Sequence, residues 1–496
     1  MDEGKGNESL EARAAGGDAE AQEEFALGLL AASEPGQAAF DSGLAWLERA
    51  IEGGRLSALA AKGHVHLQHP TLADAPAVAR DCFVTGARAG DPHAVERLED
   101  LHLFGYGVER YDEKAWSLYS QLAGYGFPAV LCHAAYLKSE GVGCDADEGE
   151  AASMILRAAA QGHTLAFYLA AHRYAGGVGV PEDPTVAVAW MELAAARGFP
   201  SAEALWQQWL DDLDDASRHN ARELAERLKQ NLRELGRAVR ALPVDEGHPE
   251  YPQRFNELVI ANYRSLGLRE LDPDAAKRGM DIRRRPARRF DLLARSWMPR
   301  VFEIPDFATP EERGFLLDLA LPLLKPTADT TGAGRAIEVD AFDGDCAIFP
   351  PYLTTPVIRN LLRRFALLTQ VRETHFEPMS LLRYSVGHEY SPHVDWFDGG
   401  RMERHWQSGD RGGQRITTAL IYLIVPQEGG DTWYPASETR ITGEPGMAVI
   451  HHNATPDGTG DPRSLHHGTP IRAGEKWLAR TAVREASLYD DFWRSL

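Results

Sequence analysis

The sequence predicts a multidomain α + β protein, in which an α-solenoid of helix-turn-helix repeats precedes a β-sandwich or barrel with flanking helices. Glycine and alanine recur every 36 residues through roughly the first 200 positions. Beyond Pro378 the apolar runs become short and β-rich, with Gly, Pro, Asp and Asn between them. The 496 residues exceed what one hydrophobic core usually holds. With 44% hydrophobic and 25% charged residues, the composition excludes disordered and collagen-like proteins.

The repeat is clearest in one glycine series: Gly54, Gly90, Gly126, Gly162 and Gly198, each 36 residues from the next. A second series with the same period lies inside the segments FGYGV, EGVGC and GGVGV. We expect the G-x-G turn to join two helices within a unit. We expect the glycine of the first series to end the second helix in a left-handed conformation. Stacked units of this kind bury a face that one unit alone could not bury.

Residues 10–205 resemble the Sel-one-like subclass of tetratricopeptide repeats, as five or six units. The resemblance implies an α-solenoid whose concave face binds proteins or peptides. The alternative is a purely architectural scaffold for the domain that follows.

Residues 206–298 are expected to form a helical and basic connector. Its helical part carries an apolar stripe at spacings of three and four residues: Leu224, Leu228, Leu232, Leu235, Val239 and Leu242. Residues 277–300 hold nine basic and two acidic side chains. This basic segment fits docking on the acidic solenoid or simple solvation, while a nucleic-acid arm and an anionic-substrate site are the alternatives.

The net charge of −21 is concentrated in residues 1–200, which hold 14 basic and 29 acidic side chains. This balance argues against binding to nucleic acid or to an anionic membrane through bulk electrostatics. The four cysteines lie far apart, and the N-terminus is acidic and polar without an apolar segment. We therefore expect a cytoplasmic protein without a secretory signal or a membrane span.

The second half begins with a short strand, PRVFEI, followed by a helix that opens at Thr309 with a proline and two glutamates. Residues 355–370 have the apolar period of a second helix. The runs that follow are typical of strands: LLRY, ITTALIYLIV, DTWYP, MAVIHH and WLARTAV. The domain at 299–490 is thus expected to be built mainly from β-strands.

A candidate metal site begins at the triplet His393-Val394-Asp395. The H-x-[DE] pattern also occurs at His248 and His375, so it is not specific by itself. Only His393 is followed in a β-rich stretch by a second histidine, His466, and by a lysine ten residues later. Two imidazoles and one carboxylate on one face of an octahedral ion leave three positions open, as non-haem Fe(II) oxygenases require. A zinc hydrolase with the same triad is the chemical alternative.

Residues 299–484 resemble the prolyl 4-hydroxylase branch of the 2-oxoglutarate- and Fe(II)-dependent dioxygenases. Four segments carry the resemblance: YSVGHEYSPHVDWF, RITTALIYLIVPQEGGDTWYP, EPGMAVIHHNATPDGTGD and RSLHHGTPIRAGEKW. The resemblance implies a double-stranded β-helix of jelly-roll type. It also implies Fe(II), 2-oxoglutarate and O₂ as cofactors, with ascorbate as an optional addition.

The same resemblance implies roles for individual residues, and it implies no catalytic side chain beyond the metal centre. The expected iron ligands are His393, Asp395 and His466; the expected 2-oxoglutarate-binding residues are Lys476, Tyr384 and Thr418; the expected substrate-side residues are Tyr390, Trp396 and Arg484.

Some histidines near these positions need a choice. Successive strand residues face opposite sides, so His466 and His467 cannot both be ligands from one regular strand. The S-L-H-x-G-x-P pattern of the family favours His466. The pair His451 and His452 ends another strand, and we expect these two to be pocket or surface residues.

One position departs from the family pattern: Ala482 stands where peptidyl-prolyl members usually carry a second tryptophan. This departure makes collagen-like and free prolyl substrates less expected. We predict a dioxygenase that hydroxylates a prolyl or other residue of a protein recruited by the repeats. The alternatives are a hydroxylase of a free amino acid and a repeat-based adaptor whose oxygenase domain is silent.

Overall fold

The computed structural model describes residues 10–33, 35–69, 72, 75–88, 112–125, 128–240, 290–327, 342–349, 355–407 and 412–488. The chain forms two compact units. The first comprises Met1–Ala146, Pro243–Arg254 and Phe492–Leu496, and the second comprises Asp147–Leu242 and Phe255–Asp491. The predicted domain limits at residues 205 and 298 are finer than this division and stay a prediction. Most of the predicted basic segment, up to residue 289, lies outside the described residues.

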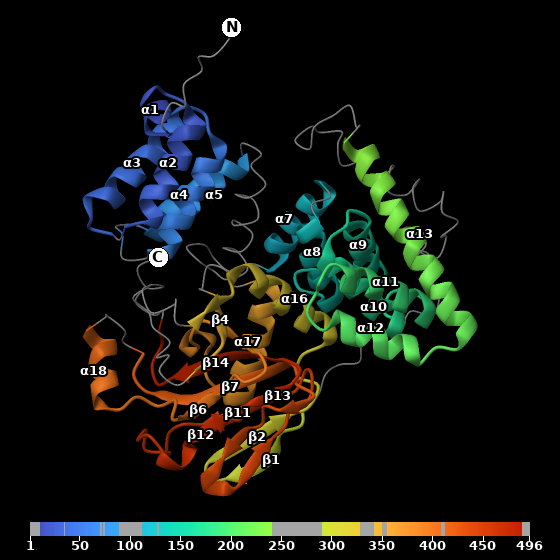
Figure 1. Ribbon diagram of the computed structural model, residues 1–496. Coiled ribbons are helices and arrows are strands. Elements are labelled where there is room, and N and C mark those ends of the chain that lie inside the picture. The colour runs from blue at the N-terminus through green and yellow to red at the C-terminus, as the bar shows by residue number, and fades with distance from the viewer. Residues whose placement is uncertain are drawn as a thin grey trace. The chain divides into compact units, whose positions relative to one another are not determined.

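The first unit is built from helices that pack against their neighbours along the chain (Figure 1). They are α1 (Leu10–Ala15), α2 (Ala19–Ala31), α3 (Ala38–Glu52), α4 (Leu56–Gln68), α5 (Ala75–Arg88), α7 (Asp112–Tyr125) and α8 (Pro128–Glu140). Small residues allow the close approach that the repeat predicts. A Cβ atom on Gly43 of α3 would lie 2.6 Å from Cγ of Leu30 in α2.

The second unit continues with α9 (Glu148–Ala160), α10 (Thr164–Gly176), α11 (Pro184–Ala196), α12 (Ala202–Asp211) and α13 (Asp215–Arg240). Three of the predicted left-handed glycines have positive φ, +86° at Gly54, +85° at Gly162 and +72° at Gly198, while Gly90 and Gly126 lie outside the described residues. In the G-x-G turn, a Cβ atom on Gly179 would lie 2.0 Å from the carbonyl oxygen of Glu148, so only glycine fits there. The predicted apolar stripe lies on α13 up to Val239, and this helix packs against α11; its last member, Leu242, lies outside the described residues.

The β domain contains an eight-stranded antiparallel sheet in the order β1-β2-β11-β7-β14-β5-β4-β3 (Figure 1). Its strands are β1 (Leu293–Trp297), β2 (Arg300–Ile304), β3 (Lys325–Pro326), β4 (Asp345–Ile348), β5 (Ser380–Tyr384), β7 (Arg415–Ile424), β11 (Ala448–His452) and β14 (Lys476–Arg484). All nine residues of the central strand β14 are buried, because both of its faces are covered.

A second sheet has the order β10-β9-β12-β6, from β6 (Tyr390–His393), β9 (Thr432–Tyr434), β10 (Thr439–Ile441) and β12 (His466–Gly468). A short pair, β8 (Glu428–Gly429) and β13 (Ile471–Ala473), accompanies it. A shared apolar core includes Leu382, Tyr422 and Tyr434 from the two larger sheets. Two antiparallel sheets that share one apolar core form the predicted double-stranded β-helix.

Two helices flank the large sheet, α16 (Pro310–Ala320) and α17 (Pro356–Thr369). The sequence predicted the start of α16, and a capping box forms there between Thr309 and Glu312, with hydrogen bonds of 3.1 Å and 2.9 Å. Glu312 also forms a buried ion pair of 2.6 Å with Arg364 of α17. Because a single carboxylate caps one helix and binds the other, the two helices are fixed against each other.

Within the second unit, the last repeats contact the β domain through α10 and α16. Arg173 of α10 is 1% exposed and forms ion pairs with Glu148 of α9 at 2.9 Å and with Glu311 of α16 at 3.0 Å. Gly314 of α16 lies against Tyr168, where an added Cβ would meet the ring at 2.8 Å. These helices therefore form one packed body with the β domain.

Candidate active site

Three potential metal ligands meet between the paired strands β6 and β12. His393 and His466 lie opposite each other in the antiparallel register, and Asp395 follows two residues after His393. The Nε2 atom of His393 is 3.7 Å from Oδ1 of Asp395, and Nε2 of His466 is 4.0 Å from Oδ2. One potential ligand atom from each of the three residues lies within 4.8 Å of those from the other two. The structure thus brings the three predicted ligands together.

The two histidines are held with the same ring nitrogen facing the centre. Nδ1 of His393 lies 2.8 Å from the carbonyl oxygen of Ser391, and Nδ1 of His466 lies 2.9 Å from that of Ser464. Since a carbonyl only accepts, Nδ1 carries the proton and Nε2 keeps its lone pair. Burial lowers the pKa of His393 to about 3, helped by the neighbouring His466, so both rings are neutral near pH 7. Neutral Nε2 atoms are what a divalent metal requires.

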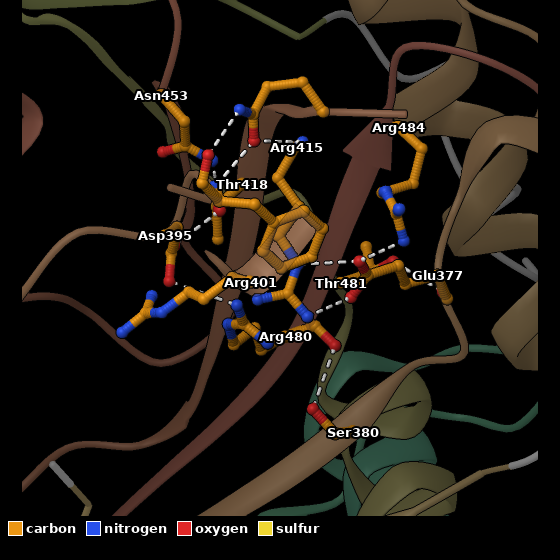
Figure 2. Close-up of polar contacts among 12 residues, drawn as sticks. Glu377, Ser380, Asp395, Arg401, Arg415, Thr418, Asn453, Arg480, Thr481 and Arg484 are labelled. Atoms are coloured by element: carbon orange, nitrogen blue, oxygen red, sulfur yellow. Dashed lines mark hydrogen bonds and ion pairs between the residues drawn. The ribbon is translucent and has the colours of Figure 1, made fainter. Parts of the chain in front are cut away.

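The carboxylate of Asp395 is fixed by two donors (Figure 2). Thr418 Oγ1 donates to Oδ2 at 2.6 Å, and Arg480 Nη2 donates to Oδ1 at 3.1 Å. Asn453 Nδ2 in turn donates to Thr418 Oγ1 at 2.9 Å. Burial by itself would raise the pKa of Asp395, but Arg480 and the neighbouring His466, His393 and His451 together outweigh it and hold that pKa well below its usual range. The side chain is therefore an anionic ligand at every physiological pH.

A pocket opens beside these ligands. It is lined by Leu382, Tyr384, Tyr390, His393, Asp395, Leu420, Thr432, His466, Gly468, Lys476, Leu478 and Arg480.

Lys476 forms the polar end of the pocket. It is 1% exposed, and its Nζ donates to the carbonyl oxygen of Gly430 at 2.6 Å. Among the described residues no carboxylate lies within ion-pair distance of Nζ. Burial lowers the pKa of Lys476 to about 7, against the opposing effect of Asp431. A buried ammonium group without a carboxylate partner suits an anionic ligand, which would restore the lost solvation.

Two tyrosines complete the pocket wall. Tyr384 of β5 lies opposite Lys476 of β14 in the strand register. The ring of Tyr390 stacks on that of His393 at 3.8 Å, with 13° between the planes. In the described part of the chain neither hydroxyl has a hydrogen-bond partner, so both can serve a polar ligand.

The other predicted site residues lie away from the pocket lining. Thr418 is fully buried and contacts Asp395 rather than the cavity. Trp396 packs over Gly460, where an added Cβ would meet the indole at 2.3 Å. Arg484 is 2% exposed and forms an ion pair of 3.2 Å with Glu377 (Figure 2). The structure therefore gives Trp396 and Arg484 packing and ion-pair contacts.

Of the adjacent histidines, His466 lies in the triad while the ring of His467 packs on Trp433 at 4.9 Å. His451 is fully buried beside the triad, with its ring 4.6 Å from that of His466. Neither ring nitrogen of His451 has a hydrogen-bond partner among the described residues.

Sequence reasoning missed two polar residues of the pocket, Thr432 and Arg480. Thr432 accepts or donates a hydrogen bond of 2.8 Å with the hydroxyl of Tyr422. It lies in the segment RITTALIYLIVPQEGGDTWYP, one of the four that carry the family resemblance. Arg480 follows Lys476 by four residues on the same face of β14. The alternation of strand residues could have found it, because residues 476, 478 and 480 must share a face.

The donor set fits a mononuclear iron site with a keto-acid cosubstrate. Two neutral imidazole nitrogens and one carboxylate stand on one side of the pocket, which is the facial arrangement of non-haem Fe(II) enzymes. The pocket then extends to a buried cation at Lys476, as a dicarboxylate needs.

Comparison with known proteins agrees with this geometry. The profile of the 2OG-Fe(II) oxygenase superfamily matches residues 379–484. Prolyl 4-hydroxylase 13 of Arabidopsis thaliana is 30% identical over 219 residues, which are 39% of this chain and 74% of that protein. Prolyl 4-hydroxylase 1 of the same plant is 32% identical over 209 residues, covering 38% and 70%. The chain belongs to the prolyl 4-hydroxylase family of 2-oxoglutarate- and Fe(II)-dependent oxygenases.

A solved structure, the viral collagen prolyl hydroxylase of Paramecium bursaria Chlorella virus-1, is 22% identical and covers 37% of this chain and 95% of its own, with a TM-score of 0.29. The Sel1 repeat profile matches residues 100–123, 129–163 and 165–199. Repeats of this kind generally mediate protein–protein interactions.

The protein is thus a 2-oxoglutarate-dependent dioxygenase of the hydroxylase type, with Fe(II), 2-oxoglutarate and O₂ as cofactors. The zinc hydrolase alternative is excluded by this family membership. Among the helices of the described ranges, none has the length and apolarity needed to cross a bilayer.

Proposed function

We propose that this enzyme hydroxylates a residue of a protein, prolyl or other, that the repeat half binds. The single observation behind the chemistry is the convergence of His393, Asp395 and His466 on one side of a pocket whose far end is Lys476. The observation behind the protein substrate is the Sel1 repeat array on the same chain.

In this proposal each side chain has a defined role. His393, Asp395 and His466 hold the iron through Nε2 atoms and one carboxylate oxygen. Lys476 binds the distal carboxylate of 2-oxoglutarate, and Tyr384 donates a hydrogen bond to the cosubstrate. When bound, Fe(II) and 2-oxoglutarate supply the oxidation of a substrate C–H bond to C–OH by O₂, with succinate and CO₂ as the coproducts.

The positioning residues act through the ligands. Thr418 and Asn453 form a hydrogen-bonded chain to Asp395 that fixes the carboxylate before the metal arrives. Tyr390 covers one face of the His393 ring and limits the access of water to that side. We therefore assign Thr418 to holding the ligand, in place of the predicted contact with the cosubstrate.

On the proposed substrate side, the site differs from that of peptidyl-prolyl hydroxylases at Ala482. Ala482 is fully buried in β14 and pairs with Thr418 across the strands. A tryptophan at this position would collide with the packed core, so the family's second tryptophan has no counterpart here.

We propose the cytoplasm as the location of the protein, since its cysteines form no disulfide in the structure.

The test uses the full chain with Fe(II), 2-oxoglutarate, ascorbate and O₂ on three substrates: intact protein extract, the same extract digested to peptides, and free amino acids. Mass spectrometry should find one added oxygen atom on intact proteins with the native enzyme and none with His393→Ala. Hydroxylation of free amino acids alone would contradict the proposal and favour the small-molecule alternative. Succinate release by the native enzyme distinguishes the protein hydroxylase and the free-amino-acid hydroxylase from an adaptor with a silent oxygenase domain.

A further inference from the structure

A second buried cation, Arg480, lies in the cosubstrate pocket. Its side chain is 9% exposed and it lines the cavity together with Lys476 and Leu478 of the same strand. Lys476 and Arg480 are four residues apart, which places their Cα atoms roughly 13 Å from each other along an extended strand. Because both face the same side of β14, the pocket has a cation near each end.

The guanidinium group of Arg480 is only partly used by the protein. Nη2 donates to Oδ1 of Asp395 at 3.1 Å, and this is its one hydrogen bond within the described chain. A guanidinium carries five N–H donors, so the Nε and Nη1 groups stay available. Since these atoms belong to a residue that lines the cavity, a bound anion can reach them.

The charges around the cavity also favour a bound anion. Its charged lining side chains are the two cations, Lys476 and Arg480, and one carboxylate, Asp395. Asp395 is a metal ligand in the proposed function, so its negative charge is shared between the metal and Arg480. A dianion with carboxylates at both ends balances this excess of positive charge, whereas a neutral ligand would leave the buried Lys476 without a counter-charge.

We propose that Arg480 is a second cosubstrate-binding residue: Nη2 holds Asp395 while the remaining N–H groups bind the keto-acid end of 2-oxoglutarate, next to the metal. Lys476 binds the other end. The inference rests on the proposed function of this pocket and adds to it the group that selects a 2-keto acid. A planar guanidinium suits this task, because it can donate to two oxygen acceptors at once.

The test measures binding, not turnover. The full-length protein is saturated with Mn(II), and dissociation constants are measured by calorimetry for 2-oxoglutarate and for 2-oxovalerate, which has the same keto-acid end but no distal carboxylate. The proteins are the native chain, Arg480→Met, Lys476→Met and, as a matched control, Arg472→Met, whose side chain is exposed.

Arg480→Met should weaken both ligands by the same factor, about tenfold or more, which is the usual effect of losing a charge-assisted hydrogen bond. Lys476→Met should weaken 2-oxoglutarate alone, and Arg472→Met should change neither. Arg480→Met binding both ligands within roughly twofold of the native chain, at saturating Mn(II), would show that Arg480 only positions Asp395 and would overturn the proposal. So would a loss confined to 2-oxoglutarate.

If Arg480→Met does not fold, Arg480→Lys tests whether Arg480 binds the keto acid. It keeps the charge but cannot donate to Asp395 and to a ligand in the same planar geometry, so both keto acids should again weaken together. Unchanged affinities for both would contradict the proposal. Failure of the proposed function is a different result: the native protein would bind neither keto acid, or Lys476→Met would weaken both equally.

Discussion

Thr418 donates a 2.6 Å hydrogen bond to the carboxylate of Asp395, and both side chains are buried. The contact joins the central strand β7 to the loop after β6, and Asn453 fixes the threonine from β11's C-terminal end. The carboxylate is consequently oriented by the protein in advance. This preorganisation is the feature that separates a metal ligand from an ordinary buried aspartate.

Replacing Thr418 by valine tests that relationship. The shape is kept while the donor to Asp395 is lost, so the affinity for Mn(II) should fall about tenfold to a hundredfold. Thr417→Val is the matched control, because Thr417 is also buried on β7 but its nearest polar partner is Nδ1 of His452 at 3.4 Å. Equal affinities for the two variants, measured by calorimetry, would refute the role of Thr418.

The affinity for 2-oxoglutarate should depend on pH through Lys476. In the free pocket its pKa is about 7, and a bound carboxylate raises that pKa because it stabilises the ammonium form. Above pH 7 binding must therefore take up a proton, and the affinity should fall with rising pH, approaching about tenfold per unit. Below pH 7 the lysine is already charged and the affinity should level off.

Calorimetry of the Mn(II)-saturated protein between mildly acidic and mildly alkaline pH measures this slope. Lys476→Met should remove it, and 2-oxovalerate, which lacks the distal carboxylate, should show none with the native protein. A flat profile for 2-oxoglutarate on the native protein would mean that Lys476 does not bind its carboxylate.

His451 should be replaceable by phenylalanine without harm to the metal site. Both of its ring nitrogens are buried without a hydrogen-bond partner in the described chain, which is costly, and phenylalanine fills a similar volume. We expect His451→Phe to raise the free energy of unfolding by about 1 kcal/mol and to leave Mn(II) affinity unchanged. His452→Phe is the control, since that ring has a polar neighbour in Thr417. A loss of Mn(II) affinity in His451→Phe would make His451 part of the centre.

The junction between α10 and α16 should be important for stability. Arg173 is paired with Glu148 and Glu311, and all three side chains are buried. Arg173→Met leaves two buried carboxylates without their cation and should cost about 3–5 kcal/mol. Arg472→Met, which breaks an exposed pair with Glu428, should cost less than about 1 kcal/mol. Thermal unfolding would compare them, and similar midpoints would show that the junction contributes little.

The same junction affects how the repeats can be studied. Removing residues 1–205 would delete Tyr168 and Arg173, which pack directly on α16. A loss of activity after such a deletion would then report damage to the β domain. Truncation at the boundary of the first compact unit, after Ala146, avoids this contact.

Local sequence patterns predicted much of the fold. The 36-residue glycine period identified the repeat turns, and the proline and glutamates after Thr309 identified the start of α16. These features are encoded by neighbouring residues, so a single sequence shows them. The packing of α10 on α16 was not predicted, because Arg173 and Glu311 are far apart in sequence and neither has a local signature.

The candidate site also contains residues that the sequence identified and residues that it did not. The triad and Lys476 could be recognised from spacing and family resemblance, and the structure brings them to one pocket. Thr418 was assigned to the cosubstrate although its hydroxyl contacts Asp395, since the direction of a side chain at the edge of a cavity depends on tertiary packing. For Arg480, strand alternation could have indicated the face that it shares with Lys476, but its contact with Asp395, 85 residues earlier, has no local signature.

We propose that His393, Asp395 and His466 hold the iron that drives 2-oxoglutarate turnover. Its most direct test is succinate formation from 2-oxoglutarate by the full chain in air with Fe(II) and ascorbate, compared with His393→Ala and with His467→Ala. We expect succinate from the native chain and from His467→Ala, and none above background from His393→Ala. Native levels of succinate from His393→Ala, in a protein that is folded and depends on Fe(II), would contradict it.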